Sequence, residues 1–320
     1  MDRSIERRHG GSQMHWGRLI PLLFALLLSF PSLPIYAATS SVVVIYPEAR
    51  GPYQKVFSSI ILGIEQRVMV SGQYKLPRKY ELEDLAKWLK ENPADSIIAL
   101  GQRGVNATKR LKSDIPYISG AHLITDGEGV SGISLTADVE RLFAQLKKIA
   151  PKVKRVVVLY NPNRFSWLHR LSEQASAKFG LKLRAYPVSS LREAAVVYGD
   201  ILDRIQSDTD AIWIMRDAIN GKSIISMLLK AAWQKKLILF SSVPSHAKKG
   251  VLFSASPDYF KLGVSLAEMA LSQNKIKGRR PLVIEPVKEL NMSLNRRTAA
   301  HLSLDISDHM DDFKWIFPAR

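Results

Sequence analysis

Short apolar runs alternate with stretches of helical hydrophobic spacing along most of the chain. The run at 41–46 (SVVVIY) is rich in β-branched residues, which is typical of a strand buried on both faces of a parallel sheet. The stretch at 54–68 then repeats apolar residues every three or four positions, which predicts an amphipathic helix. The same alternation predicts further strands at 96–100, 115–119, 155–160, 181–186, 211–215, 237–240, 251–254, 282–285 and 292–294, and helices at 81–92, 103–112, 138–149, 167–179, 190–205, 224–232 and 259–272.

Capping residues mark the expected starts of three of these helices. Ser190 and Glu193 have the spacing of a capping box, in which each side chain accepts from a free amide of the first turn. Thr136 and Ser223 are expected N-caps of the helices at 138–149 and 224–232.

Strands separated by helices predict an α/β fold with parallel sheets covered on both faces. Two such series, split near residue 135, predict two doubly wound parallel-sheet lobes joined by hinge strands near 121–136 and 255–260. The tail after residue 302 either packs on a lobe or stays loose. The expected division is 1–37 signal peptide, 38–134 lobe 1 with part of 256–285 returning to it, 135–255 lobe 2 with part of 286–302 returning to it, and 303–320 tail.

The first residues have the pattern of a secretory signal. Four arginines precede an apolar stretch at 19–30 that is too short to span a bilayer, and small residues at 37–38 suit cleavage. The alternative is an uncleaved anchor. We therefore expect the rest of the chain in the periplasm.

The formal charge of +17 is strongly positive, and the first 37 residues contribute only +2 of it. Export removes nucleic acid as a partner for the remaining +15. An anionic ligand, an acidic docking partner or a membrane surface would use such a charge, and lysines dispersed over helix faces would also produce it.

Several signals for enzymes fail on inspection. The chain has no cysteine, which excludes disulfides, thiol nucleophiles and cysteine metal sites. The G-x-G-x-x-G match at 127–132 opens a strand-like crossover and not a helix, and Arg216 stands where a phosphate loop ending at 221–223 needs glycine. His122, His169, His246 and His301 lack metal-ligand spacing, and no G-x-S-x-G elbow exists. We expect no catalysis, cofactor or metal; a hydrolase acting in the cleft is the enzymatic alternative.

Polar residues after the predicted strands are the candidate site, because ligands of doubly wound sheets bind beyond the strands' carboxyl ends. Helix-start amides at 101–103 and near Ser241 can hold a carboxylate. Asp217 can accept from an ammonium group, and Arg103 or Arg216 can pair with an anion. Tyr46, Phe165 and Trp167 can supply an apolar wall. The candidate residues are Tyr46, Glu48, Arg50, Gly101, Gln102, Arg103, Asn161, Phe165, Arg216, Asp217, Ser241, Ser242 and Asp258.

Several stretches also carry a resemblance. They are VVVLYNP at 156–162, WIMRD at 213–217, LILFS at 237–241, KGVL at 249–252 running into DYFKLG at 258–263, and the segment 290–302. In order and spacing they resemble the ATP-binding-cassette (ABC) substrate-binding family that includes periplasmic binding proteins for aromatic amino acids.

This resemblance implies a type I periplasmic-binding fold with a ligand between the lobes, closure about the hinge and delivery to a membrane permease. It carries ligand contacts over to Asn161, Asp217, Ser241 and Asp258. The first loop departs from the family, which has a His-Pro-Ala-Leu-like segment where this chain has YPEARGPY at 46–53. The ligand, an amino acid or small organic anion, can therefore differ from the family's. We expect a monomer, with a membrane sensor protein as the alternative partner.

Overall fold

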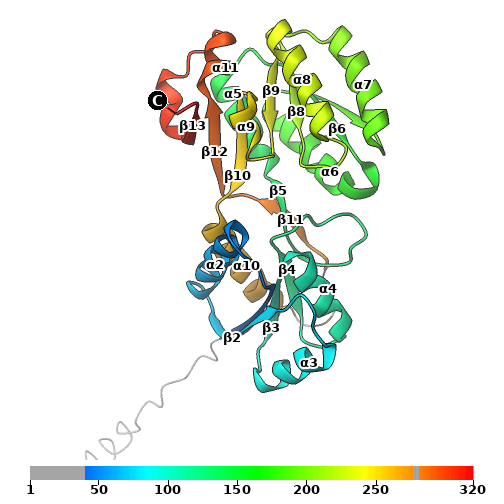
Figure 1. The fold of residues 1–320 in the computed structure, drawn as a ribbon, viewed down its shortest axis with the longest axis vertical. Helices are drawn as coiled ribbons and strands as arrows, with labels where there is room; N and C mark the ends of the chain where they lie inside the picture. The colour runs from blue at the N-terminus through cyan, green and yellow to red at the C-terminus, as the bar shows by residue number, and fades with distance from the viewer. Residues whose placement is uncertain (1–39, 277, 279–280, 320) are drawn as a thin grey trace, which may run out of the picture. The chain divides into compact units, whose positions relative to one another are not determined.

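The chain builds two separate sheets, each with helices on its faces (Figure 1). The computed structural model describes residues 40–276, 278 and 281–319. The predicted signal segment 1–37 lies outside the described residues.

The first sheet has the strand order β11-β5-β4-β3-β1-β2, and all its pairs are parallel. With its helices it is called the first lobe. Its members are β1 (Ser41–Pro47), α2 (Pro52–Glu65), β2 (Met69–Leu76), α3 (Leu82–Glu91), β3 (Ser96–Leu100), α4 (Gly101–Leu111), β4 (Tyr117–Gly120), β5 (Gly132–Ala137), α10 (Tyr259–Asn274) and β11 (Ile284–Val287).

The second sheet has the order β13-β12-β10-β9-β8-β6-β7, in which only the β10–β12 pair is antiparallel. With its helices it is called the second lobe. Its members are α5 (Val139–Ile149), β6 (Arg155–Tyr160), α6 (Pro162–Lys178), β7 (Lys182–Pro187), α7 (Leu191–Arg204), β8 (Asp210–Ile214), α8 (Lys222–Lys235), β9 (Ile238–Ser241), α9 (His246–Lys249), β10 (Phe253–Pro257), β12 (Leu290–Asn295), α11 (Arg296–His301), a 3-10 helix (Ser307–Asp312) and β13 (Phe313–Phe317).

Within the described residues the chain crosses between the lobes three times, from β5 to α5, from β10 to α10 and from β11 to β12 (Figure 1). Phe143 of α5 packs in the core of the second lobe, whereas Leu266 of α10 packs in that of the first. Because β5 and β10 end at crossings, the carboxyl ends of the parallel strands in both sheets lie toward the segments that join the lobes. The candidate ligand-binding residues are predicted to lie at these strand ends.

Helices α2 and α10 pack closely against each other. This contact holds the segment that returns from the second lobe against the rest of the first lobe. A Cβ atom on Gly63 would lie 1.9 Å from the carbonyl oxygen of Phe260, and one on Gly263 would lie 1.9 Å from that of Ile60. Only glycine allows this approach of two helix backbones.

The predicted α/β class with parallel sheets is confirmed; two expected N-caps are wrong, and one strand was not predicted. Sequence analysis missed β2, an edge strand whose residues are mostly exposed or half-buried and therefore lack an apolar run. Asp138, and not Thr136, caps α5, because its carboxylate accepts from the amide of Arg141. Gly221 precedes α8 without a side-chain cap, so Ser223 is not the N-cap.

The structure also answers two other expectations, the cap of α7 and the place of the tail. The Ser190 hydroxyl accepts from the amide of Glu193 at 3.2 Å, which confirms the cap of α7. The tail packs on the second lobe, where β13 adds an edge strand beside β12. The numerical division of the chain into lobes stays a prediction, although β5 continues in the first sheet to Ala137.

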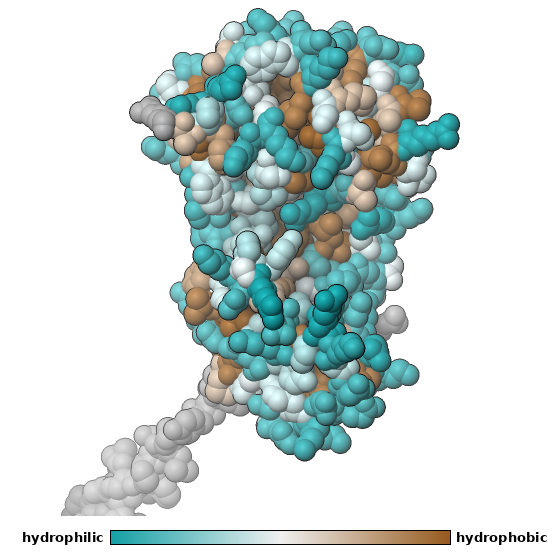
Figure 2. Space-filling view, in the orientation of Figure 1, coloured by the Kyte–Doolittle hydropathy of each residue, from teal (hydrophilic) through white to brown (hydrophobic). Residues whose placement is uncertain are grey.

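Hydrophilic residues cover most of the face in Figure 2, and apolar residues form smaller patches among them. Among the described residues, no helix has the length and apolar character needed to cross a membrane.

Candidate functional site

Asp217 is the most enclosed charged side chain at the strand ends of the second lobe. It lies three residues beyond β8, and its side chain is 0% exposed. Its Oδ2 accepts from the amide of Asn161, which follows β6, at 3.2 Å. Its Oδ1 lies 3.6 Å from Nη1 of Arg164. The two neighbouring strand ends are therefore joined through one carboxylate.

A short turn holds Asp217 in place. The Asp217 amide donates to the carbonyl of Met215, and the Asn220 amide donates to the carbonyl of Asp217. The Asn220 side chain binds the Met215 carbonyl and accepts from the Tyr198 hydroxyl at 3.0 Å. Burial, followed by the nearby charge of Asp217, raises the pKa of Tyr198, so this hydroxyl stays a neutral donor.

Asn161 and Arg164 belong to the start of α6, which is irregular. Asn161 is its N-cap, with its side-chain oxygen accepting from the amide of Asn163 at 3.0 Å. At Phe165 the backbone leaves helical geometry (φ −133°, ψ 27°) and resumes it after that residue. Arg164 therefore sits on a short first turn beside Asp217, with its guanidinium 5.3 Å from the centre of the Phe165 ring.

Phe165 and Trp167 are buried in the core of the second lobe at 0% and 6% exposure. Sequence analysis expected both as an apolar wall for a ligand. In this structure their rings pack inward, and Arg164 covers Phe165 from outside.

The end of β9 carries a hydrogen-bonded group whose partners all belong to the second lobe. The Ser241 hydroxyl contacts the Ile214 carbonyl at 3.1 Å, the Val243 amide at 3.0 Å and Nδ1 of His246 at 2.9 Å. The Ser242 hydroxyl accepts from the indole of Trp213 at 2.8 Å. The helix start expected near Ser241 belongs to α9, which begins at His246 and has only four residues.

The surroundings of this strand end lower the pKa of His246. Burial, followed by the nearby charges of Lys249 and Arg216, lowers the pKa of its imidazole to about 4. The ring is therefore neutral at pH 7. Arg216 is half-buried, and within the described ranges it has neither a hydrogen bond nor an ion pair. Of the predicted residues, Asn161 contacts Asp217, while Arg216 precedes Asp217 in the chain and acts on His246; Arg164, which was not predicted, is a further neighbour of Asp217.

In the first lobe, Tyr46, Glu48 and Arg50 line a hollow of about 520 Å³ between α2 and the edge strand β2. The Tyr46 hydroxyl donates to the side chain of Gln73, and its ring packs on Phe57 at 5.9 Å. Burial and then the charge of Glu65 raise the pKa of Tyr46. Glu48 and Arg50 are exposed at the end of β1.

The residues after β3 contact their own lobe. Gly101 begins α4 with φ 70°, a left-handed value that suits glycine. The Gln102 side chain donates to Asn106 at 3.1 Å. The Arg103 guanidinium donates to the carbonyls of Pro77 and Arg78. Asp258 likewise caps α10 by accepting from the amide of Lys261.

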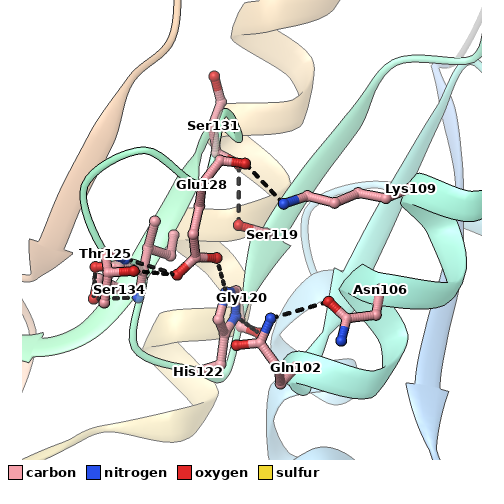
Figure 3. Close-up of polar contacts among 11 residues, drawn as sticks. Gln102, Asn106, Lys109, Ser119, Gly120, His122, Thr125, Glu128, Ser131 and Ser134 are labelled. Atoms are coloured by element: carbon pink, nitrogen blue, oxygen red, sulfur yellow. Dashed lines mark hydrogen bonds and ion pairs between the residues drawn. The ribbon is translucent and has the colours of Figure 1, made fainter. Parts of the chain in front are cut away.

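A buried histidine–carboxylate pair closes the loop after β4 (Figure 3). Nε2 of His122 lies 3.4 Å from Oε2 of Glu128, and the two side chains are 5% and 17% exposed. The other Glu128 oxygen accepts from the amide and hydroxyl of Thr125, while Lys109 of α4 donates to the Glu128 carbonyl at 2.7 Å. Although burial opposes it, these Thr125 bonds and His122 hold the pKa of Glu128 below its usual value.

The same loop contacts the second lobe through Asp126. Its amide donates to the carbonyl of Arg164 at 3.0 Å, and its carboxylate accepts from the amide of Ser166 at 2.6 Å. Asp126 therefore caps α6 where that helix resumes after Phe165. Sequence analysis did not identify Asp126, Glu128 or this contact.

The arrangement suits noncovalent recognition of a small charged molecule. Guanidinium groups bind carboxylates through directional hydrogen bonds, and a buried carboxylate fixes their orientation. In the part of the chain that the structure describes, no cluster of three or more His, Asp or Glu side chains could hold a metal ion.

Comparisons with known proteins agree on the fold. A conserved domain protein from Vibrio cholerae is similar with a TM-score of 0.50 and 21% identity, covering 87% of this chain and 99% of that chain. An ABC domain from Streptococcus pneumoniae, in complex with L-Trp, gives 0.50 and 18% over 87% and 100%. A substrate binding protein with adhesive properties from Clostridium difficile gives 0.55 and 17% over 86% and 98%. The comparison with curated proteins gives no match.

These structural likenesses identify the type I periplasmic binding protein fold. The family model for ABC transporter substrate binding proteins matches residues 62–312, which is most of the chain. The resemblance found in the sequence is thereby confirmed. The chain belongs to the ABC transporter substrate binding protein family.

Proposed function

We propose that the chain is a periplasmic solute-binding protein that captures a small polar ligand, an amino acid or a small organic anion, between its lobes for delivery to an ABC permease. One observation carries the proposal: at the carboxyl ends of β6 and β8 the buried carboxylate of Asp217 lies 3.6 Å from the partly exposed guanidinium of Arg164, and Arg216 precedes Asp217 in the chain. Such ends are where doubly wound sheets bind ligands. Guanidinium groups with free donors give a ligand carboxylate directional hydrogen-bond partners.

In this proposal the first lobe supplies the opposing wall. Glu48 and Arg50 after β1, and Gln102 after β3, are exposed at the carboxyl ends of its strands. The remaining candidates, Tyr46, Gly101, Arg103, Ser241, Ser242 and Asp258, support the shape of the loops through the contacts described above.

The proposed mechanism is closure about the three crossings. A ligand that binds both walls shifts the population toward the closed arrangement and is shielded from water there. The permease then distinguishes loaded from empty protein by the surfaces that the lobes present together. The export of the chain as a monomer to the periplasm is part of this proposal, supported by the N-terminal signal pattern and by family membership.

A thermal-shift screen of amino acids and small organic anions tests the proposal. A ligand that binds only the folded state stabilises it by mass action, by about 2.7 kcal/mol at a hundred times its Kd. We expect at least one compound to raise the melting temperature, and calorimetry to give a saturable binding curve. If no compound of either class binds, the proposed function is wrong.

Asp217→Ala is the matching variant. It removes the acceptor for Asn161 and the partner of Arg164, and we expect it to abolish binding of the compound found in the screen. Because Arg164 is 40% exposed and can be hydrated, we expect the fold to persist. Unchanged binding by calorimetry would remove Asp217 from the site.

A further inference from the structure

We propose that Arg164 makes this site selective for small carboxylic acids that lack an ammonium group. Its guanidinium lies beside the Asp217 oxygen that would otherwise accept from a ligand ammonium. The Arg164 donors that do not face Asp217, together with those of Arg216, are available to a ligand carboxylate. The inference rests on the proposed function and names the substrate class of the same site.

The first step is the state of Asp217. Its side chain is fully buried, and only one of its oxygens has a hydrogen bond, from the Asn161 amide. The other, Oδ1, has a single charged neighbour within 4 Å among the described residues, the guanidinium of Arg164. A buried carboxylate needs a compensating charge. Arg164 therefore already fills the position that a ligand amine would take.

The second step is the orientation of Arg164. The guanidinium lies over the Phe165 ring, with one nitrogen toward Asp217. The backbone of Arg164 is fixed by the bond from the Asp126 amide to its carbonyl. Its side chain is 40% exposed, so the donors that do not face Asp217 remain available. A planar group with five donors can bind a carboxylate through two of them while keeping its contact with Asp217.

The third step is the balance of charge around the strand ends. Arg164 and Arg216 are cationic, Lys249 lies close enough to lower the pKa of His246, and the His246 ring is neutral. Asp217 offsets one of these charges. The carboxylate of Asp126, which accepts from the neutral amide of Ser166, offsets a second, so that one positive charge remains in excess. A ligand ammonium would therefore enter a region of positive potential, whereas a carboxylate would be attracted to it.

The test uses pairs of compounds that differ only in the amino group: succinate with aspartate, glutarate with glutamate, 3-phenylpropionate with phenylalanine, and indole-3-propionate with tryptophan. Calorimetry on the full exported chain gives Kd for both members of each pair. We expect wild type to bind the acid of at least one pair about tenfold or more tightly than its amino acid, the size expected for one charge-assisted contact.

Two variants assign that preference to Arg164. In Arg164→Gln, we expect the affinity for the acid to fall about tenfold or more and the affinity for its amino acid to rise, because Asp217 becomes free to accept from an ammonium group. Arg164→Lys should retain the preference for the acid with weaker binding. Arg170→Gln, at an exposed position of the same helix, is the matched control and should leave both affinities unchanged.

The outcomes separate the inference from the proposed function. If wild type prefers the amino acids, or if Arg164→Gln keeps the acid preference of a protein that folds normally by circular dichroism, the inference is overturned while solute binding stands. If no member of any pair binds wild type, the proposed ligand classes fail together with the inference.

Discussion

The strand ends of both lobes carry polar residues, but these residues have different partners. In the first lobe, Arg103 is bound to the carbonyls of Pro77 and Arg78, and His122 is bound to Glu128. In the second lobe, Arg216 has no such partner among the described residues, and Arg164 keeps much of its guanidinium exposed. The comparison teaches that a cation at a strand end can bind a ligand only when its own chain leaves some of its donors free.

The first prediction removes a side chain that supports a loop of the first lobe. Glu128→Ala removes the carboxylate beside His122 and the acceptor of two hydrogen bonds from Thr125, so we expect the free energy of unfolding to fall by about 3 kcal/mol. Ligand affinity should fall by no more than about threefold, because the pair reaches Arg164 only through the Asp126 contact of the same loop. Urea denaturation and calorimetry measure the two quantities.

Glu140→Ala is the matched control, because Glu140 forms an exposed ion pair with Lys178. Such pairs contribute about 1 kcal/mol or less. Equal losses in the two variants would contradict a structural role for the His122–Glu128 pair.

The second prediction concerns His246 and pH. Its pKa is about 4 in the folded protein and about 6.5 when unfolded, so below pH 6.5 the unfolded chain binds a proton that the folded chain does not. Unfolding should therefore become easier as pH falls from about 6.5 to 4, by up to about 3 kcal/mol in all. Well below pH 4 the His246 imidazole is protonated in both the folded and the unfolded state, so it should cause no further loss of stability.

His246→Gln isolates this contribution, because other carboxyl groups titrate in the same range. The difference in unfolding free energy between wild type and variant should narrow as pH falls from 6.5 to 4. A difference that is constant across this range would show that the imidazole is not held neutral.

The third prediction tests the binding side directly. Arg216→Gln should weaken binding of a small acid about tenfold, whereas Arg103→Gln in the first lobe should leave it within about twofold. Calorimetry with the same compound on both variants gives the comparison. Equal losses would mean that the two lobes share the recognition of charge.

The smallest expected effect is at the contact between the lobes. Asp126→Asn keeps an acceptor for the Ser166 amide but removes its charge, so we expect about a threefold change in affinity. Hydrogen exchange at Ser166 should become faster in the variant. Unaltered exchange there would exclude the Asp126 carboxylate as a cap of α6.

The sequence predicts the buried parts of the fold better than the exposed ones. The apolar runs at β1, β3 and β6 identify these strands, because both faces of a parallel sheet are buried. Strand β2 lies at an edge, where its side chains meet solvent and no apolar pattern is required.

For the candidate site, the sequence likewise predicts which residues follow the strand ends but not which partners their side chains contact. The strand ends that hold Asn161, Arg216 and Asp217 follow from the order of strands and helices. That Arg103 is satisfied by Arg78, and that Asp126 meets α6, depends on contacts between segments distant in sequence, which periodicity does not encode. Arg164 stands between Asn161 and Phe165, and its charge in that loop was the available signal. The role of each candidate residue in binding stays a prediction.

Hydrogen exchange of the backbone amides, with and without the tightest acid from the paired panel, tests the central claim most directly. The account predicts protection at 161–166 and 215–217 in the second lobe, together with 48–50 and 101–103 in the first. Protection confined to the hollow between α2 and β2, with the second-lobe segments unchanged, would contradict it.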